Sequence, residues 1–382
     1  MARSGPARCY DLMNTDRHRD RSNRSRRRSP KLIQLRARRC LLAAVGALAL
    51  SPVAGTLLID RCPIDVRFPV ASTTINGWRA HVRAPQILLL GSSRMGCAVS
   101  VDRITPLVRK VSGDDTVEVF SAAVPGGEPL TMDFLAARLL TENRIPRLVM
   151  VEIAPDTVGD YNLWLDGVVV RQFTIGDVLR NLGGFFHSTA KARWNLCSSR
   201  LIPFYYHRNE WRTWAGRRFV PKRTYTASAT VSSPAFQAVE WPERRIADQN
   251  DMDRVTRLKD GVRRTRKALA GYEVLGRTSE AMEHLIVLCR DREIPVILVQ
   301  MPVHSAQRAL YTPEIIRSFR GFIDRLTSTY ACRYVDLSDR VPDPLFLDCS
   351  HSSSEGEEYF SRLFAEEILG PAWRTRAQPP QE

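Results

Sequence analysis

The sequence has no Cys-x-x-Cys pair and no cluster of cysteine with histidine, although it contains eight cysteines and seven histidines. Closely spaced thiolates and imidazoles are the usual signature of a zinc site, so neither a metal ion nor another cofactor is expected. The chain also lacks the composition of a disordered or fibrous protein, because 44% of its residues are hydrophobic and 25% are charged. We therefore predict a globular protein with a hydrophobic core.

Acidic residues are scarce at the start of the chain. Thirteen Arg and Lys residues against three Asp residues give residues 1–40 a charge of +10, out of +15 for the whole chain. The body that follows is only mildly basic, so its charge gives no reason to expect a nucleic-acid partner. Residues 1–39 are predicted to form a basic, disordered, cytoplasmic tail, because a run of like charges repels itself.

A run of twenty residues without charge, 40–59, follows the tail and is bounded by Arg39 and Asp60. A helix of that length is about 30 Å long, which matches the hydrocarbon thickness of a bilayer. Because arginines precede the run, we expect a single membrane-spanning helix with a cytoplasmic N-terminus and a periplasmic or extracellular body. A cleaved signal peptide remains the alternative.

Beyond this segment, short apolar runs alternate with stretches of helical periodicity. Strands are expected at residues 86–90, 117–124, 147–153, 295–301 and 332–337. Helices between successive strands imply crossover connections, and crossovers imply parallel strands. The pattern predicts an α/β fold, a three-layer α/β/α sandwich around a five-stranded, mostly parallel sheet.

The body divides into segments of different character. We predict a tether at 60–85, a first half of the α/β domain at 86–155, a mostly helical insertion at 156–278, a second half at 279–370 and a disordered tail at 371–382. The insertion contains Trp211, Trp214, Arg217 and Arg218. We interpret this stretch as a solvated amphipathic helix; contact with a sugar, a polyanion or a membrane surface is the alternative.

Two polar motifs follow predicted strands, one at each end of the body. Gly91-Ser92-Ser93-Arg94 follows the first strand, and Asp348-Cys349-Ser350-His351 follows the last. Functional sites in open parallel sheets form at the carboxyl ends of the strands. Asp348 can fix the tautomer of His351, whose Nε2 can then take a proton from a serine hydroxyl. Helix-capping loops are the simpler interpretation of each motif alone.

Together these motifs resemble those of the SGNH/GDSL hydrolase superfamily. The resemblance assigns the nucleophile to Ser93 rather than to Ser92, and matches Asp348 and His351 to the family's last block, followed by Ser353 to Gly356. It implies an SGNH or flavodoxin-like sandwich and a Ser-His-Asp triad. It also implies that the oxyanion is held by the N–H of Ser93 and by Gly126 or Gly127, the counterparts of the glycine in the family's second block.

The third block of the family, Gly-x-Asn-Asp, is missing. The expected place, near Glu152, contains Val-Glu-Ile-Ala-Pro-Asp over residues 151–156, so the asparagine that donates to the oxyanion is absent. Asn162, Asn181 or a backbone N–H near Pro155 are the candidate substitutes. Candidate substrate-binding residues are Arg94, Glu152, Gln300 and His304.

The Gly-Ser-Ser motif, the anchor and the lost asparagine together resemble exported SGNH branches, such as the D-alanyl transfer protein of teichoic acids and alginate-type O-acetyltransferases. The resemblance implies a serine esterase or O-acyltransferase whose substrate is an acylated glycan of the envelope or extracellular space, or a small ester. A catalytically idle domain that binds glycan, or that scaffolds an envelope assembly through protein partners, is the alternative.

Overall fold

The computed structural model describes residues 30–61, 64–81, 84–141, 144–159, 190–208 and 251–377, together with residues 174, 176 and 212. The chain divides into two compact units, Met1–Ser51 and Pro52–Glu382. The larger unit contains the sheet and both polar motifs.

The first helix, α1 (Pro30–Arg61), is long and apolar. Its segment Gln34–Leu58 has a mean hydropathy of 2.0, with only 6% of the most apolar window buried. Leu42 and Leu48 are 70% and 76% exposed. By length and composition this helix is able to cross a membrane. It begins before residue 40, so the expectation of disorder across the whole of 1–39 is wrong for the residues from Pro30 onward.

The five predicted strands form one sheet with the order β2-β1-β3-β4-β5, and every pairing is parallel. The predicted α/β sandwich is thereby confirmed. The strands are β1 (Ile87–Leu90), β2 (Val119–Ser121), β3 (Leu148–Glu152), β4 (Val296–Gln300) and β5 (Arg333–Asp336). All residues of β1, β3 and β4 are buried, as continuous apolar runs in a sheet covered on both faces require.

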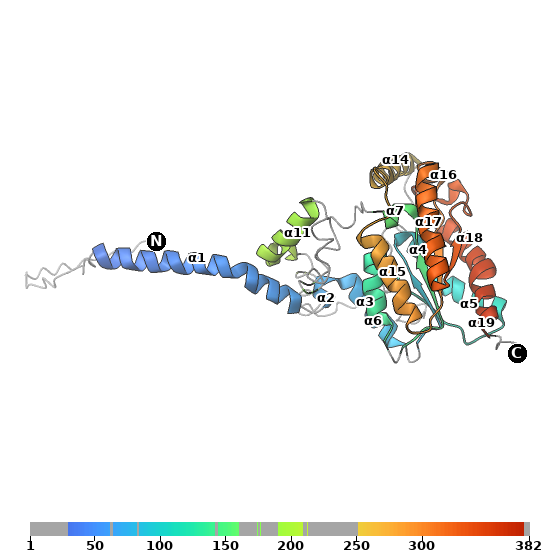
Figure 1. Cartoon of the computed structure of the whole chain (residues 1–382), viewed down its shortest axis with the longest axis horizontal. Helices are drawn as coiled ribbons and strands as arrows, with labels where there is room; N and C mark the ends of the chain where they lie inside the picture. Colours follow the sequence, from blue (N-terminus) through green and yellow to red (C-terminus); the bar gives the residue numbers. More distant parts are fainter. Residues whose placement is uncertain are drawn as a thin grey trace, which may run out of the picture. The chain divides into compact units, whose positions relative to one another are not determined.

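Helices cover both faces of the sheet (Figure 1). One face carries α3 (Pro69–Ala80), α6 (Pro129–Leu139), α15 (Arg277–Arg290) and α17 (Pro313–Tyr330). The other carries α4 (Ser93–Ala98), α5 (Val101–Ser112), α18 (Ser354–Phe364), the π-helical turn η4 (Ala365–Leu369) and α19 (Gly370–Ala377). Each helix places its apolar side against the strands, which gives the three layers.

Two segments at the borders of the body are better ordered than predicted. The expected tether at 60–85 contains α2 (Ile64–Arg67) and α3, in which Trp78 is 1% exposed and donates from Nε1 to the carbonyl of Leu139 at 3.0 Å. The expected disordered tail at 371–382 begins with α19, in which Trp373 is 2% exposed and donates to Asp114 at 3.0 Å. In each segment a buried tryptophan packs into the core together with smaller apolar residues.

The described part of the insertion is helical. It contains α7 (Pro155–Val158), α11 (Ala190–Leu201), α12 (Pro203–Tyr206) and α14 (Asp251–Ala268). The aromatic and basic residues Trp211, Trp214, Arg217 and Arg218 lie outside the described residues.

The strand order brings the polar motifs to one edge of the sheet. The chain runs outward in one direction through β1 and β2 and in the other through β3, β4 and β5, so the order reverses between β1 and β3. Crevices that bind ligands form at such a reversal, at the carboxyl ends of the strands. Ser92 and Ser93 follow β1, and Glu152 is the last residue of β3.

Candidate active site

Ser93 is the first residue of α4, directly after a tight turn from β1. Ser92 caps this helix, because its Oγ accepts a hydrogen bond from the N–H of Arg94 at 3.1 Å. Ser93 itself is 9% exposed. The hydroxyl of Ser92 is thus used to cap the helix. The hydroxyl of Ser93 is not, and it faces the motif that contains Asp348 and His351.

Ser93, His351 and Asp348 form a hydrogen-bonded row. The Nε2 of His351 lies 2.8 Å from the Oγ of Ser93, and its Nδ1 lies 2.6 Å from the Oδ2 of Asp348. The structure thus brings together the three residues that the sequence nominated. In this order an imidazole can accept the serine proton while the carboxylate holds the other ring nitrogen protonated.

Asp348 is arranged to stay ionised. Its Oδ1 accepts hydrogen bonds from the N–H groups of Ser350 and His351, at 2.7 and 2.9 Å. Burial acts to raise the pKa of this carboxyl, but the hydrogen bond and charge of His351 and the two backbone donors outweigh it and hold the pKa below its usual value. A carboxylate in this state favours the His351 tautomer with its proton on Nδ1.

The loop that carries Asp348 and His351 is held by a hydrogen bond within itself and by contacts with helix α14. The N–H of Leu347 donates to the carbonyl of His351 at 2.8 Å, which closes the loop on itself. Helix α14 lies against it, with Arg257 Nε donating to the Leu347 carbonyl at 3.4 Å. Gly261 faces Cys349 so closely that a Cβ at Gly261 would overlap the Cys349 sulfur. Helix α14 therefore restrains the position of the loop.

Glu152 holds the serine turn from beneath. Its Oε2 accepts from the N–H groups of Ser92 at 2.7 Å and Met95 at 3.3 Å, and its Oε1 accepts from the Ser92 hydroxyl at 2.6 Å. Burial raises the pKa of this carboxyl, opposed by Arg94 and the three donors. The side chain is fully buried. The expectation that Glu152 binds substrate is therefore wrong, because its carboxylate faces the turn.

Gly91 makes this contact possible. A Cβ at that position would lie 2.7 Å from the Cβ of Met95 and 2.8 Å from the Oε2 of Glu152. No side chain fits there without moving the carboxylate, so the glycine at the end of β1 is a steric requirement of the turn.

Arg94 is engaged in a buried ion pair. Its guanidinium contacts the carboxylate of Asp156 through both terminal nitrogens, and the two side chains are 11% and 8% exposed. The Tyr311 hydroxyl donates to Asp156 at 2.8 Å, and Gln307 Nε2 donates to that hydroxyl at 3.0 Å. Burial opposes ionisation of Asp156, but Arg94 and Tyr311 hold its pKa below the usual value. Arg94 thus supports the turn after Ser93, in contrast to the substrate contact expected of it.

Gln300 and His304 also bind groups of the protein itself. The Oε1 of Gln300 accepts from the Tyr334 hydroxyl at 2.6 Å, and Gln300 is 4% exposed. His304 caps the short helix α16 (Ser305–Arg308), where its Nδ1 accepts from the N–H of Ala306 at 3.0 Å. Burial lowers the pKa of His304. Its backbone N–H donates to the carbonyl of Cys349 at 3.0 Å, so it braces the loop before His351.

The candidate oxyanion donors differ in availability. The N–H of Gly127 donates to the carbonyl of Val124 at 2.8 Å and is therefore occupied. Among the described residues, the N–H groups of Ser93 and Gly126 have no acceptor. Gly126 has φ of 67°, a conformation that favours glycine. Of the two glycines expected to donate, Gly126 remains the candidate.

Neither backbone donor directly before Pro155 can replace the missing asparagine. Asn162 and Asn181 lie outside the described residues. Near Pro155, the N–H of Ile153 donates to the Val299 carbonyl at 2.9 Å and that of Ala154 donates to the Thr157 hydroxyl at 3.1 Å. These two backbone donors are therefore occupied.

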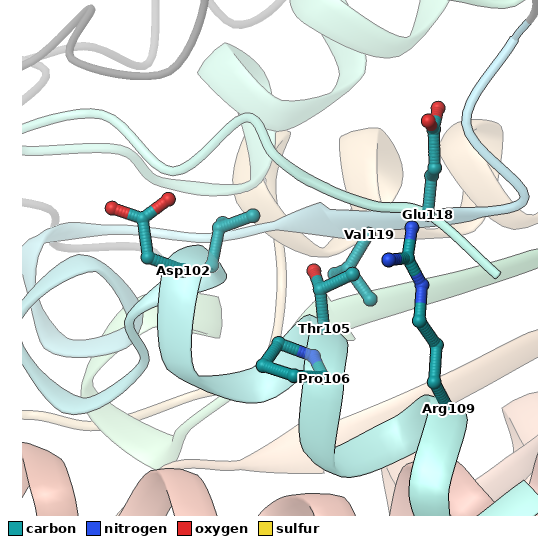
Figure 2. A pocket seen from close by; sticks show the side chains of 7 residues that line it. Asp102, Thr105, Pro106, Arg109, Glu118 and Val119 are labelled. Carbon is teal, nitrogen blue, oxygen red and sulfur yellow. The ribbon is translucent and has the colours of Figure 1, made fainter. Parts of the chain in front are cut away.

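A surface cleft of about 230 Å³ lies elsewhere, between α5 and the edge strand β2 (Figure 2). Asp102 lies at one end of it and Glu118 and Arg109 at the other, with Thr105 between them. The Arg109 Nε donates to the carbonyl of Val117 at 2.8 Å. None of the predicted site residues lines this cleft, and no three His, Cys, Asp or Glu side chains within the described ranges gather to hold a metal ion.

Comparisons with known proteins give a weak likeness. No family model and no curated protein matches the sequence. A Streptococcus pneumonia protein provisionally named a platelet activating factor is 13% identical, with a TM-score of 0.35 over 80% of this chain and 94% of its own. AlinE4 is 14% identical, with a TM-score of 0.30 over 78% of this chain and 100% of its own. AlinE4 is an esterase of the SGNH-hydrolase family. That is the family whose motifs the sequence resembles, but scores this low do not decide function.

Proposed function

We propose that this protein is a membrane-anchored serine esterase or O-acyltransferase whose nucleophile is Ser93. The observation that carries the proposal is the row from Ser93 Oγ to His351 Nε2 at 2.8 Å and from His351 Nδ1 to Asp348 at 2.6 Å. A serine activated by a neighbouring base that a third group orients is the recurrent arrangement for acyl transfer. The buried supports at Glu152 and Arg94 are consistent with a turn held in one geometry.

The reaction would proceed through an acyl-enzyme. His351 takes the hydroxyl proton of Ser93 as the oxygen attacks the ester carbonyl, and the N–H groups of Ser93 and Gly126 stabilise the resulting oxyanion. His351 then gives its proton to the departing alcohol. Water takes up the acyl group in an esterase, whereas a sugar hydroxyl takes it up in a transferase. In either case His351 removes the proton of the incoming group and returns it to the Ser93 oxygen as the bond between that oxygen and the acyl carbon breaks.

One oxyanion donor fewer has a predictable cost. Removal of a single donor typically lowers the rate by roughly 10²–10³-fold, which corresponds to about 3–4 kcal/mol. With the family's asparagine absent, we expect slow turnover on simple esters unless the substrate or a residue of the insertion supplies a third donor. The preferred substrate class is an acylated glycan of the envelope or extracellular space, which can contribute its own hydroxyl groups near the ester.

The anchor proposal places the body outside the cytoplasm. Helix α1 carries an apolar segment, Gln34–Leu58, and Arg36, Arg38 and Arg39 lie at its N-terminal end. Basic residues are retained on the cytoplasmic side, so the chain after α1 would be periplasmic or extracellular. A reporter that is active only outside the cytoplasm, fused after residue 382, is expected to give signal. An active cytoplasmic reporter at the same place would contradict this topology.

A fluorophosphonate probe tests the enzyme directly, because it reacts with activated serines. We expect labelling of the wild-type protein and none of Ser93→Ala. Ser92→Ala removes the cap of α4 and a donor to Glu152 but leaves the nucleophile, so it should be labelled more slowly than the wild type. Circular dichroism and thermal melting establish that each variant is folded. A folded wild-type protein that resists the probe would contradict the esterase proposal and leave a glycan-binding domain without activity.

A further inference from the structure

The segment formed by α11 and α12 exposes apolar side chains, which is the opposite of what a helix on a water-facing surface does. Its exposed side chains recur at helical spacing and are apolar: Trp194 is 67% exposed, Leu201 47%, Ile202 58% and Tyr205 61%. Cys197, also exposed, lies on the same stripe. A surface helix in water normally exposes its polar side. Here the apolar side faces outward.

The covered side of the segment is mostly polar, with Leu196, at 7% exposed, as its buried hydrophobic residue. Ser198, Ser199 and Arg200 are 7%, 1% and 6% exposed, and His207 is 3% exposed. The Ser198 hydroxyl donates to the carbonyl of Trp194 at 2.6 Å. Water in contact with the apolar stripe would cost about 25 cal/mol for each Å² of exposed apolar surface. The arrangement therefore suits an apolar medium on the outside.

An ion pair links α11 to the residue that follows the apolar segment of α1. Arg200 Nη1 contacts the Oδ1 of Asp60 at 3.1 Å, and the two side chains are 7% and 21% exposed. Asp60 follows the apolar segment Gln34–Leu58 of α1 by two residues. At about 1.5 Å per residue, Asp60 lies about 3 Å beyond the end of that segment. Helix α11 is thus fastened to the level at which α1 would leave the membrane.

We propose that α11 and α12 lie on the bilayer, with Trp194, Leu201 and Tyr205 inserted into its interfacial region. At twelve residues, α11 is about 18 Å long and too short to span the hydrocarbon. Tryptophan and tyrosine favour the boundary between lipid and water. Exposed Arg208 ends the stripe, stacked 4.5 Å from the Tyr205 ring, where lipid phosphates would meet its charge. The proposal rests on α1 being the membrane anchor.

Spin-label accessibility on the full chain in phospholipid vesicles tests this proposal. A nitroxide is attached to Cys197 after Cys9, Cys40 and Cys62 are replaced by serine; the other four cysteines are 7% exposed or less. Oxygen partitions into lipid, whereas a nickel chelate stays in water. Matched labels in the same background, with Cys197→Ser, are placed on α17 by Thr329→Cys and within α1 by Leu48→Cys.

We expect the ratio of oxygen to nickel collisions at Cys197 to exceed that at Thr329→Cys several-fold and to approach that at Leu48→Cys. A Cys197 label as open to nickel as Thr329→Cys, beside a lipid-exposed Leu48→Cys, would overturn the α11 proposal and leave the anchor intact. A nickel-accessible Leu48→Cys would refute the anchor and the α11 proposal with it. Dipolar broadening at Cys197 that dilution with unlabelled chain removes would show a second copy in place of lipid, and would also overturn the proposal.

Discussion

The imidazole of His351 lies within hydrogen-bond distance of the Ser93 hydroxyl, although 258 residues separate the two in sequence. The turn after β1 and the loop after β5 do not bring these two side chains together by their own local structure. Glu152 fixes the turn before Ser93, and Arg257 and Gly261 of α14 restrain the loop before His351. The contact therefore depends on supports from β3 and from the insertion, and these supports lead to testable predictions.

Asp348→Asn is expected to abolish most of the activity while the protein stays folded. The amide can donate to Nδ1 and so favour the wrong tautomer of His351. In addition, no negative charge remains to stabilise the imidazolium that forms during the reaction. By analogy with other triads, turnover should fall on the order of 10⁴-fold. Esterase kinetics and the rate of fluorophosphonate labelling measure this. Asp291→Asn, at an exposed position on the protein surface, is the matched control and should have no effect.

Glu152→Ala should both destabilise the protein and slow it. Three donors from Ser92 and Met95 would lose their acceptor, and a buried unsatisfied donor costs about 1–3 kcal/mol. Urea unfolding gives the stability, and separate values of kcat and KM distinguish a positioning effect from a binding effect. Glu152→Gln retains one carbonyl for the two N–H groups, so we expect it to recover much of kcat. Equal loss of activity in both variants, with unchanged stability, would contradict the positioning role.

The Arg94–Asp156 pair should contribute stability that depends on pH. The pKa of Asp156 is lower in the folded protein than its usual value, so the contribution is fully present above about pH 4 and is lost as the pH falls through the folded pKa. At neutral pH, Asp156→Asn leaves a buried charge without a partner and should cost about 3–5 kcal/mol. The difference in unfolding free energy between wild type and variant should shrink below about pH 4. A constant difference from pH 3 to pH 7 would contradict the assignment.

Gly261→Ala should displace the loop of His351. The new Cβ would overlap the sulfur of Cys349, and displacements of about 1 Å at a catalytic group can cost about 10²-fold in rate. Removing the sulfur by Cys349→Ala makes room, so the double variant should regain activity. Gly321→Ala on α17, where no atom lies within 4 Å of the added Cβ, is the control. Failure of Cys349→Ala to rescue would show that the contact does not control the loop.

The sequence predicted the sheet and the serine turn because both depend on local pattern. The apolar run at Ile87–Leu90 requires burial on both faces, and a serine after Gly91 has few alternatives to a turn at the strand end. The choice of Ser93 over Ser92 came from family resemblance, and the capping of α4 by Ser92 agrees with it. These inferences needed no knowledge of distant contacts.

The supports of the site could not be predicted, because their partners lie far apart in the chain. Glu152 meets Ser92 across 60 residues, and Asp156 meets Tyr311 across 155. One signal was available: Glu152 interrupts a run, Leu148–Ile153, that is apolar on both faces, so its carboxylate had to find donors inside the protein. Trp78 and Trp373 are comparable, since each is buried in the core and belongs to a segment whose composition indicates a tether or a tail.

The order of the site along the chain also has a consequence for biosynthesis. Ser93 is synthesised early, but Asp348 and His351 come after the last strand, and a polypeptide that stops before them contains a serine with no base. Premature termination products would therefore be inert toward esters. A chain still being synthesised on the ribosome would have no esterase activity until the segment with Asp348 and His351 had been added.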